Sequence, residues 1–342
     1  MPGKEHMGRV FIIAEAGVNH NGSVKTAQKL VDAAVEAGAD AVKFQTFRAD
    51  RIIAFDTPKV AYQKNSTNAQ EPMLDMIRRL ELSEPDHRIL KDHCHQKHIE
   101  FMSTPFDEES VDLLHRLKMG IYKIPSGEIT NVGLLRHVAL KKKRIILSTG
   151  MSALDEVAFA IRVIYQTGNK KVSLLHCVSQ YPAPFDQMNL RAISSMEKKF
   201  KVPVGLSDHS LGIWMPVAAV ALGACIIEKH LTLDKNMQGP DHRASLEPEE
   251  FKEMVKAIRA TETALGDGIK KPAVCERGHI HLVRKCIVAS RELPAGHVLT
   301  KEDLQVKRAG RGLAPAVLES LIGKRTLKQL GKDIPLERRY LR

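Results

Sequence analysis

The sequence has few of the features that mark secreted or membrane-spanning proteins. Its five cysteines form no Cys-x-x-Cys pair, which argues against a disulfide framework and favours reduced thiols. No apolar run approaches the ~20 residues of a membrane helix, and the start of the chain lacks an apolar signal core. We therefore expect a cytoplasmic protein with no membrane partner.

Negatively charged residues are scarce toward the C-terminus. The whole chain carries a formal net charge of +12. Residues 276–342 contain fifteen Lys or Arg against seven Asp or Glu, so +8 of that excess lies in the last fifth. Such a basic tail can bind nucleic acid. However, Tyr340 is the only aromatic residue after Phe251, so no base-stacking rings interleave the charges. We expect that a small anionic substrate accounts for this excess of basic residues, and that the protein does not bind nucleic acid.

The chain of 342 residues has an ordinary globular composition, 43% apolar and 27% charged. Short aliphatic runs alternate with amphipathic segments of helical spacing, and eight such units are complete by about residue 266. This alternation predicts a (β/α)8 TIM barrel over residues 1–268. A Gly- and charge-rich linker over 269–282 then leads to short strands, which predict a small β-rich domain over 283–342.

Polar residues stand at or just after the ends of the aliphatic runs. In barrels of this kind the C-terminal ends of all the strands build the active site, so the pattern predicts an enzyme. The residues concerned are Glu15, Lys43, Gln45, Thr104, Lys123, Ser126, Ser148, Ser179, Ser207, His209, Glu228 and His230.

These residue types indicate three kinds of chemistry. His209 and His230 follow neighbouring strands, and two imidazoles with open coordination positions suit a divalent metal such as Mn2+. The lysines and serines together supply the charge and the directional hydrogen bonds that a partly buried dianion needs. Glu15 and Glu228 either act as a general base or hold a lysine in place, and both roles stay open. Asp241, on the loop after the last strand, can reach a polyhydroxy substrate.

Ordered motifs cover nearly the whole chain, from about Val10 to Asp333. They read FIIAEAGVNHNGS, VKFQTF, STPFD, YKIPSGE, STGMS, HCVSQYPAP, GLSDHS, EKHLTLDKNMQGPDHRASLEP and VKRAGRG. Together they resemble the sialic acid synthase (N-acetylneuraminate synthase) family. The tail resembles the antifreeze-like (SAF) domain at the C-terminus of that family.

The resemblance implies condensation of phosphoenolpyruvate with an N-acetylated aminosugar in its open aldehyde form, with release of phosphate by C–O cleavage. It also implies a divalent metal, with Mn2+ first and Mg2+ or Co2+ as alternatives, held by His209 and His230. By similarity the catalytic residues are Glu15, Lys43, Lys123 and Glu228. The implied substrate contacts are Gln45, Thr104, Ser126, Glu128, Ser148, Ser179, Tyr181, Ser207, Asp241 and Arg308. Gln45, Tyr181 and Asp241 resemble sugar contacts. The phosphoenolpyruvate site is resembled by two lysines and four serines: Lys43, Lys123, Ser126, Ser148, Ser179 and Ser207.

The same resemblance implies a homodimer in which the C-terminal domain of one chain covers the barrel of the other. Arg308 would then reach into the partner's site. The long polar insertion at 48–83, which interrupts the barrel rhythm, is expected to form a lid and to decide which sugar is accepted.

Several functions stay open at the level of sequence. The favoured one is synthesis of N-acetylneuraminate from N-acetylmannosamine. Its alternative is the same reaction on 2,4-diacetamido-2,4,6-trideoxymannose, giving legionaminate, because the two sugars differ in their substituents and not at the reacting end. A more distant alternative is an aldolase or lyase that forms a Schiff base through Lys43 or Lys123. A third is a non-catalytic binder of nucleic acid or acidic glycan through the basic tail.

Overall fold

The computed structural model describes residues 8–60, 63–64, 67–68 and 70–342. The chain divides into two compact units, Met1–Gly266 and Asp267–Arg342, and each has its own core. Among the described residues, none of the helices combines the length and the apolar character needed to cross a membrane.

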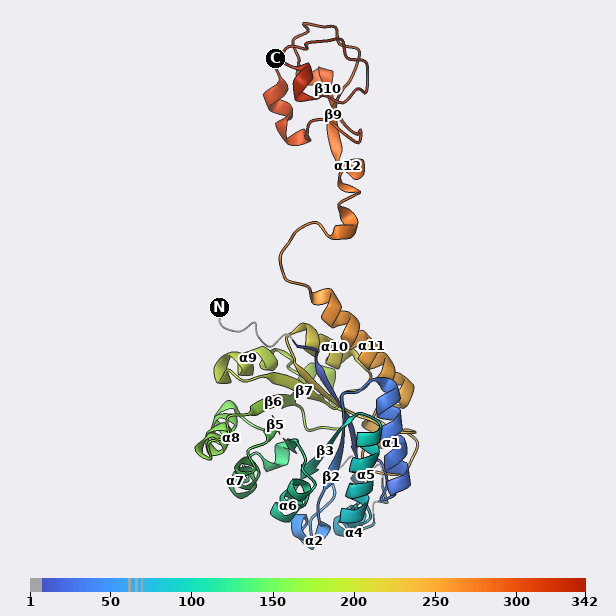
Figure 1. Ribbon diagram of the computed structural model, residues 1–342, viewed down its shortest axis with the longest axis vertical. Coiled ribbons are helices and arrows are strands. Elements are labelled where there is room, and N and C mark those ends of the chain that lie inside the picture. Colours follow the sequence, from blue (N-terminus) through green and yellow to red (C-terminus); the bar gives the residue numbers. More distant parts are fainter. Residues whose placement is uncertain (1–7, 61–62, 65–66, 69) are drawn as a thin grey trace. The chain divides into compact units, whose positions relative to one another are not determined.

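The first unit is a closed barrel of eight parallel strands surrounded by helices (Figure 1), which confirms the predicted (β/α)8 architecture. Each strand pairs with its neighbours in chain order, and β8 pairs with β1 to close the ring. The strands are β1 Phe11–Gly17, β2 Ala41–Thr46, β3 Glu100–Pro105, β4 Ile121–Ile124, β5 Arg144–Ser148, β6 Val172–Cys177, β7 Val204–Asp208 and β8 Ile226–His230.

The helices begin and end at local signals. The hydroxyl of Ser23 accepts the Thr26 amide at the start of α1, which ends at Gly38 in the left-handed conformation with φ 83°. Ser83 and Asp86 form a capping box on α5. The helices of this unit are α1 Val24–Ala37, α2 Ala49–Ile52, α4 Met73–Arg78, α5 Glu84–Gln96, α6 Glu108–Arg116, α7 Val132–Leu140, α8 Leu154–Gln166, α9 Arg191–Phe200, α10 Trp214–Ala221 and α11 Pro248–Leu265.

The insertion at 48–83 lies between β2 and α5 and contains the short helices α2 and α4. Residues 61, 62, 65, 66 and 69 of this insertion lie outside the described residues.

The inside of the barrel is built in layers, because alternate residues of a strand point to the same face. One buried apolar cluster comes from seven of the eight strands, and on β7 its place is taken by Gly205, where a Cβ would lie 2.1 Å from the Ile226 carbonyl oxygen. Its buried members are Ile13, Ala41, Met102, Ile121, Ile146, Leu175 and Ile226. The residues two positions further along each strand therefore form the next layer, at the C-terminal mouth, and most of them are polar.

The other face of each strand packs against the helices. Phe44 of β2, Leu30 of α1 and Phe251 of α11 are fully buried members of this larger core. Each such side chain contributes about 1.5–3 kcal/mol when it is removed from water. The rigid outer core holds the ends of the strands in place around the mouth.

The second unit contains the antiparallel pair β9 Lys285–Ala289 and β10 Leu304–Arg308. Isolated bridges, including Val288 with Pro335 and Leu293 with Leu330, join its remaining segments. Within the segment 269–282, expected as a linker, there is a 3-10 turn at Val274–Glu276, and the short helix α12 begins there and spans Ile280–Val283. Further 3-10 turns complete the unit, at Lys301–Asp303, Pro315–Leu321 and Arg338–Tyr340.

Asp303 is a fully buried anchor of this second unit. Its carboxylate accepts hydrogen bonds from Arg291 Nε at 2.9 Å and from the Thr300 amide at 2.9 Å, and it pairs with His297 Nε2 at 2.7 Å. Burial raises the pKa of this carboxyl, but hydrogen bonds from His297, Thr300 and Arg291 outweigh burial and hold the pKa at about 2.

We therefore expect the second unit to lose stability in acid. A carboxyl whose pKa is lower in the folded than in the unfolded state stabilises the fold above its unfolded pKa of about 3.9. That contribution is lost as the pH falls from about 4 toward the folded pKa of about 2. Hydrogen exchange of the full chain should show protection of residues 285–289 declining over this range. Asp303→Asn should accelerate their exchange roughly tenfold or more at neutral pH and remove the acid step. An unchanged acid step in the variant would contradict this role for Asp303.

Candidate active site

A cavity of about 370 Å³ opens at the C-terminal mouth of the barrel. Side chains from all eight strands, or from the loops that follow them, line it. The residues from the sequence analysis that the structure brings together here are Glu15, Lys43, Gln45, Thr104, Lys123, Ser126, Ser148, Ser179, Tyr181, Ser207, His209, Glu228, His230 and Asp241.

Two candidates lie elsewhere. Glu128 ends the 3-10 turn Ser126–Glu128, and its carboxylate accepts a hydrogen bond of 2.8 Å from Asn131 Nδ2 at the start of α7. It is not among the residues that line the cavity. Arg308 is exposed at the end of β10 in the second unit, and its role in a partner's site stays a prediction.

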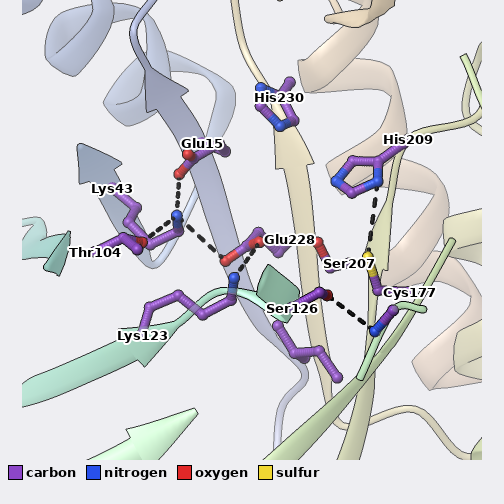
Figure 2. A network of polar contacts seen from close by, with 12 residues as sticks. Glu15, Lys43, Thr104, Lys123, Ser126, Cys177, Ser207, His209, Glu228 and His230 are labelled. Atoms are coloured by element: carbon purple, nitrogen blue, oxygen red, sulfur yellow. Dashed lines mark hydrogen bonds and ion pairs between the residues drawn. The ribbon is translucent and has the colours of Figure 1, made fainter. Parts of the chain in front are cut away.

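Four buried charges of alternating sign lie at the centre of the cavity (Figure 2). Lys43 Nζ contacts a carboxylate oxygen of Glu15 and lies 3.7 Å from Glu228 Oε2 and 2.9 Å from Thr104 Oγ1. Lys123 Nζ lies 3.3 Å from Glu228 Oε1 on the other side. Because the two ammonium groups balance the two carboxylates, these charges can stay buried without a bound ligand.

The two carboxylates are tuned in opposite directions. Burial raises the pKa of Glu15 more than Lys43 lowers it, so this pKa is raised overall. Burial also raises the pKa of Glu228, but Lys123, Lys43 and a 2.8 Å hydrogen bond from Ser207 Oγ outweigh it and lower the pKa to about 2. Burial lowers the pKa of Lys43, yet the charges of Glu15 and Glu228 raise it overall. Such opposed environments are typical of groups with different chemical tasks.

Two of the serines, Ser126 and Ser179, lie close to Gly150, which has no side chain. A Cβ on Gly150 would lie 2.3 Å from Ser179 Oγ and 2.8 Å from Ser126 Oγ. Ser126 Oγ accepts the Gly150 amide at 2.9 Å, so its own proton is available to a ligand. Ser148 Oγ is buried and has no hydrogen-bond partner among the described residues. These hydroxyl groups are therefore arranged to donate to an anion.

The two histidines face each other, with ring centroids 5.5 Å apart. His209 Nδ1 lies 2.8 Å from the Val178 carbonyl oxygen, which directs Nε2 toward the Tyr181 hydroxyl at 3.0 Å. His230 Nδ1 is buried with no hydrogen-bond partner among the described residues, and Asp241 Oδ2 lies 3.7 Å from it. Burial and the charge of Glu15 raise the pKa of Asp241 to about 7.

This donor set fits a divalent cation held by two imidazoles, with other positions open to water or substrate oxygens. The described residues contain no group of three or more His, Cys, Asp and Glu side chains arranged to hold a metal. Two imidazoles with the other positions open are typical of a catalytic metal site and not of a closed structural one.

Sequence reasoning missed the lining residues Cys177 and Gln63 and, beside the serines, Gly150. Cys177 is the inward residue of β6, two positions after Leu175, and its sulfur lies 3.7 Å from His209 Nδ1. The two-residue alternation along the strand was the signal that could have found it. Gln63 is buried on the cavity lining, and Gly150 makes room for the serines.

Comparison with known proteins agrees with this geometry. The model of the NeuB family matches residues 30–270, and that of the SAF domain matches residues 284–337. The chain belongs to the NeuB family. It is therefore an enzyme, built as a TIM barrel followed by a SAF domain.

Two curated members of the family are N,N'-diacetyllegionaminic acid synthases. The protein of Campylobacter jejuni is 47% identical over 96% of this chain and 98% of its own length. That of Legionella pneumophila is 49% identical over 95% of this chain and 93% of its own. A solved structure, the N-acetylneuraminic acid synthetase of Leptospira borgpetersenii in complex with citrate, is 35% identical with a TM-score of 0.71, covering 80% of this chain and 91% of that one.

A buried ion pair behind the cavity holds the ends of the two strands that precede the histidines. Lys229 and Asp208 are both fully buried, and Lys229 Nζ lies 2.5 Å from Asp208 Oδ2 and also contacts the Ser210 carbonyl oxygen. Asp208 Oδ1 accepts the Ser210 amide at 3.0 Å. His209 lies between Asp208 and Ser210, and His230 follows Lys229, so this pair sets the position of both rings.

Removing one partner of this pair should destabilise the barrel. Lys229→Met leaves the Asp208 carboxylate buried without its counter-ion, which typically costs about 3–5 kcal/mol in the free energy of unfolding. Urea denaturation measures this. As a control, Lys256→Met breaks the exposed Lys256–Glu253 pair and should change stability by no more than about 0.5 kcal/mol. Equal effects of the two substitutions would contradict the anchoring role, and adding Asp208→Asn to Lys229→Met should recover part of the loss.

Proposed function

We propose that this NeuB-family enzyme condenses phosphoenolpyruvate with 2,4-diacetamido-2,4,6-trideoxymannose to form N,N'-diacetyllegionaminate and inorganic phosphate. Identities of 47% and 49% to two N,N'-diacetyllegionaminic acid synthases, over nearly the whole chain, are the observation that carries the choice of sugar. They support the legionaminate alternative better than synthesis of N-acetylneuraminate.

The lysines and the serine hydroxyl groups would bind phosphoenolpyruvate. Among the described residues, Lys123 Nζ pairs only with Glu228, so two of its N–H groups are available to the phosphate or carboxylate. The protons of Ser126 and Ser148 are available in the same way. Because the resident charges already cancel, the anion would be held mainly by these directed donors.

In the reaction, the methylene carbon of phosphoenolpyruvate attacks the aldehyde carbon of the sugar and forms the new C–C bond. Water then adds to the cationic C2 centre, and the C–O bond to phosphate breaks. Glu15 contacts one lysine and the Gln45 amide, and its raised pKa suits a group that takes and returns a proton. Glu228, which lies between two lysines and Ser207, would act as their fixed counter-ion.

His209 and His230 would hold a divalent metal, Mn2+ in the first place. Such an ion would polarise the aldehyde oxygen of the sugar and make its carbon more electrophilic. Asp241, Tyr181 and Gln45, which also line the cavity, would contact the sugar.

The charges around Lys43 argue against a Schiff base on this residue. An amine must lose its proton to attack a carbonyl, which requires a lowered pKa. The pKa of Lys43 is instead raised by Glu15 and Glu228.

The proposal also includes a homodimer with exchanged C-terminal domains, in which Arg308 contacts the partner's substrate, and a cytoplasmic location. Sedimentation of the full chain as a monomer would contradict the dimer.

Phosphate release from phosphoenolpyruvate tests the reaction directly. We expect release with the 2,4-diacetamido sugar and Mn2+, a nine-carbon keto acid as the second product, and loss of both after chelation. Release with N-acetylmannosamine alone would move the enzyme to the N-acetylneuraminate branch. Silence with both sugars, together with a borohydride-trapped pyruvate adduct, would favour the aldolase.

Gly150→Ala tests the anion site. The added methyl group should displace the hydroxyl groups of Ser126 and Ser179 and raise the KM for phosphoenolpyruvate about tenfold or more, since each lost hydrogen bond to a charged group costs about 1.5–3 kcal/mol. The melting temperature should change little, because serine side chains can rotate away. Gly127→Ala is the matched control: Gly127 lines the cavity, but nothing lies within 4 Å of a Cβ there. A similar KM in the two variants would contradict the assignment.

A further inference from the structure

A second cavity, of about 460 Å³, lies beside the first at the mouth of the barrel. Three segments far apart in the sequence form its wall: the loop after β1 with Asn21, the insertion with Asn68 and Leu80, and the loop after β8 with Gln238 and Pro240. None of the candidate catalytic residues lines it.

The wall between the two cavities is thin. Pro240 lines both of them, and the next residue, Asp241, lines the first. On α4, Met76 lines the second cavity and the next residue, Ile77, lines the first. The two cavities are therefore neighbours, and Pro240 and α4 separate them.

The walls are held in place before any ligand binds. Asn21 Nδ2 donates to the Gln238 carbonyl oxygen at 2.9 Å, and Asn21 Oδ1 lies 3.2 Å from His242 Nε2. Gly22 lets the first loop approach the insertion, since a Cβ there would lie 2.3 Å from the Arg79 carbonyl oxygen. Gly239 likewise packs on His242, with a Cβ position 2.6 Å from its ring. Because these walls are already ordered, the loss of conformational entropy on binding is smaller.

The lining suits a neutral group that combines an amide with methyl carbons. Met76 and Leu80 are buried apolar residues at 2% and 6% exposure, and the polar residues Asn21, Asn68 and Gln238 line the same cavity. Arg79 is the one charged residue among the described lining residues. Its guanidinium is paired with Glu71, with Nη1 2.5 Å from Oε1 and Nη2 2.9 Å from Oε2, so no unpaired charge faces the cavity.

We propose that this second cavity binds the far end of the open-chain sugar, taking the acetamido group on C4 and the methyl group at C6. The inference rests on the proposed function and adds the reason why the diacetamido sugar would be preferred to N-acetylmannosamine, which has hydroxyl groups at both positions. The insertion thereby selects the sugar, while the barrel layer performs the reaction.

Gln238→Trp tests the assignment. The exposed Gln238 side chain stands at the rim, and its described contact with Asn21 uses only the backbone oxygen, which the substitution retains. An indole there would fill part of the second cavity. We expect kcat/KM for the diacetamido sugar to fall about tenfold or more, with the KM for phosphoenolpyruvate within about twofold. The loss with N-acetylmannosamine should be smaller, because its hydroxyl group at C4 takes less space than an acetamido group. Asn236→Trp, on the same loop but outside both cavities, is the matched control.

The outcomes separate this inference from the proposed function. A wild-type enzyme that prefers the diacetamido sugar, with a Gln238→Trp variant of unchanged preference, would overturn the cavity assignment and leave the reaction standing. Equal loss with both sugars would overturn it as well. A wild-type enzyme that turns over neither sugar would overturn the reaction. In that case calorimetric titration with the diacetamido sugar decides the cavity: weaker binding to Gln238→Trp than to Asn236→Trp supports it, and equal binding overturns it.

Discussion

Buried charge balance is the constraint on which the barrel mouth depends. Two ammonium groups and two carboxylates lie in one layer, where an unpaired charge would cost several kcal/mol. Glu228 is the shared partner, within 3.7 Å of Lys43 and 3.3 Å of Lys123. This arrangement keeps two cations in a buried site, and the two carboxylates raise the pKa of Lys43.

The rest of the fold supports that layer from below and from outside. The apolar cluster beneath it closes the barrel, and the outward Lys229–Asp208 pair holds the strand ends that lead to His209 and His230. The inward and outward faces of β8 therefore have separate tasks, although Glu228, Lys229 and His230 are consecutive. One face supplies chemistry, and the other supplies the rigidity that keeps the chemical groups in position.

The proposed function divides reaction and selectivity between the barrel and its loops. The candidate reacting groups come from strand ends and closely following residues, whose positions are set by the closed sheet. The second cavity is built from the insertion and two other loops, which can change without disturbing the polar layer. Such a division fits a family whose members carry one chemistry to different sugars, as the names of the legionaminic acid and N-acetylneuraminic acid synthases indicate.

Local patterns in the sequence determined the barrel, its helix boundaries and the polar strand ends, because a two-residue or 3.6-residue period and a capping residue act over short distances. Close resemblance of motifs determined the family. What only the tertiary structure decided was which polar groups meet. It added Cys177, the inward residue of β6, to the cavity that Ser179 also lines, turned Glu128 toward Asn131, and revealed the space at Gly150 between two hydroxyl groups. It also paired Lys229 with Asp208 and formed the second cavity from three distant segments. Those features depend on distances between atoms of different strands and loops, and such distances exist only once the sheet has closed.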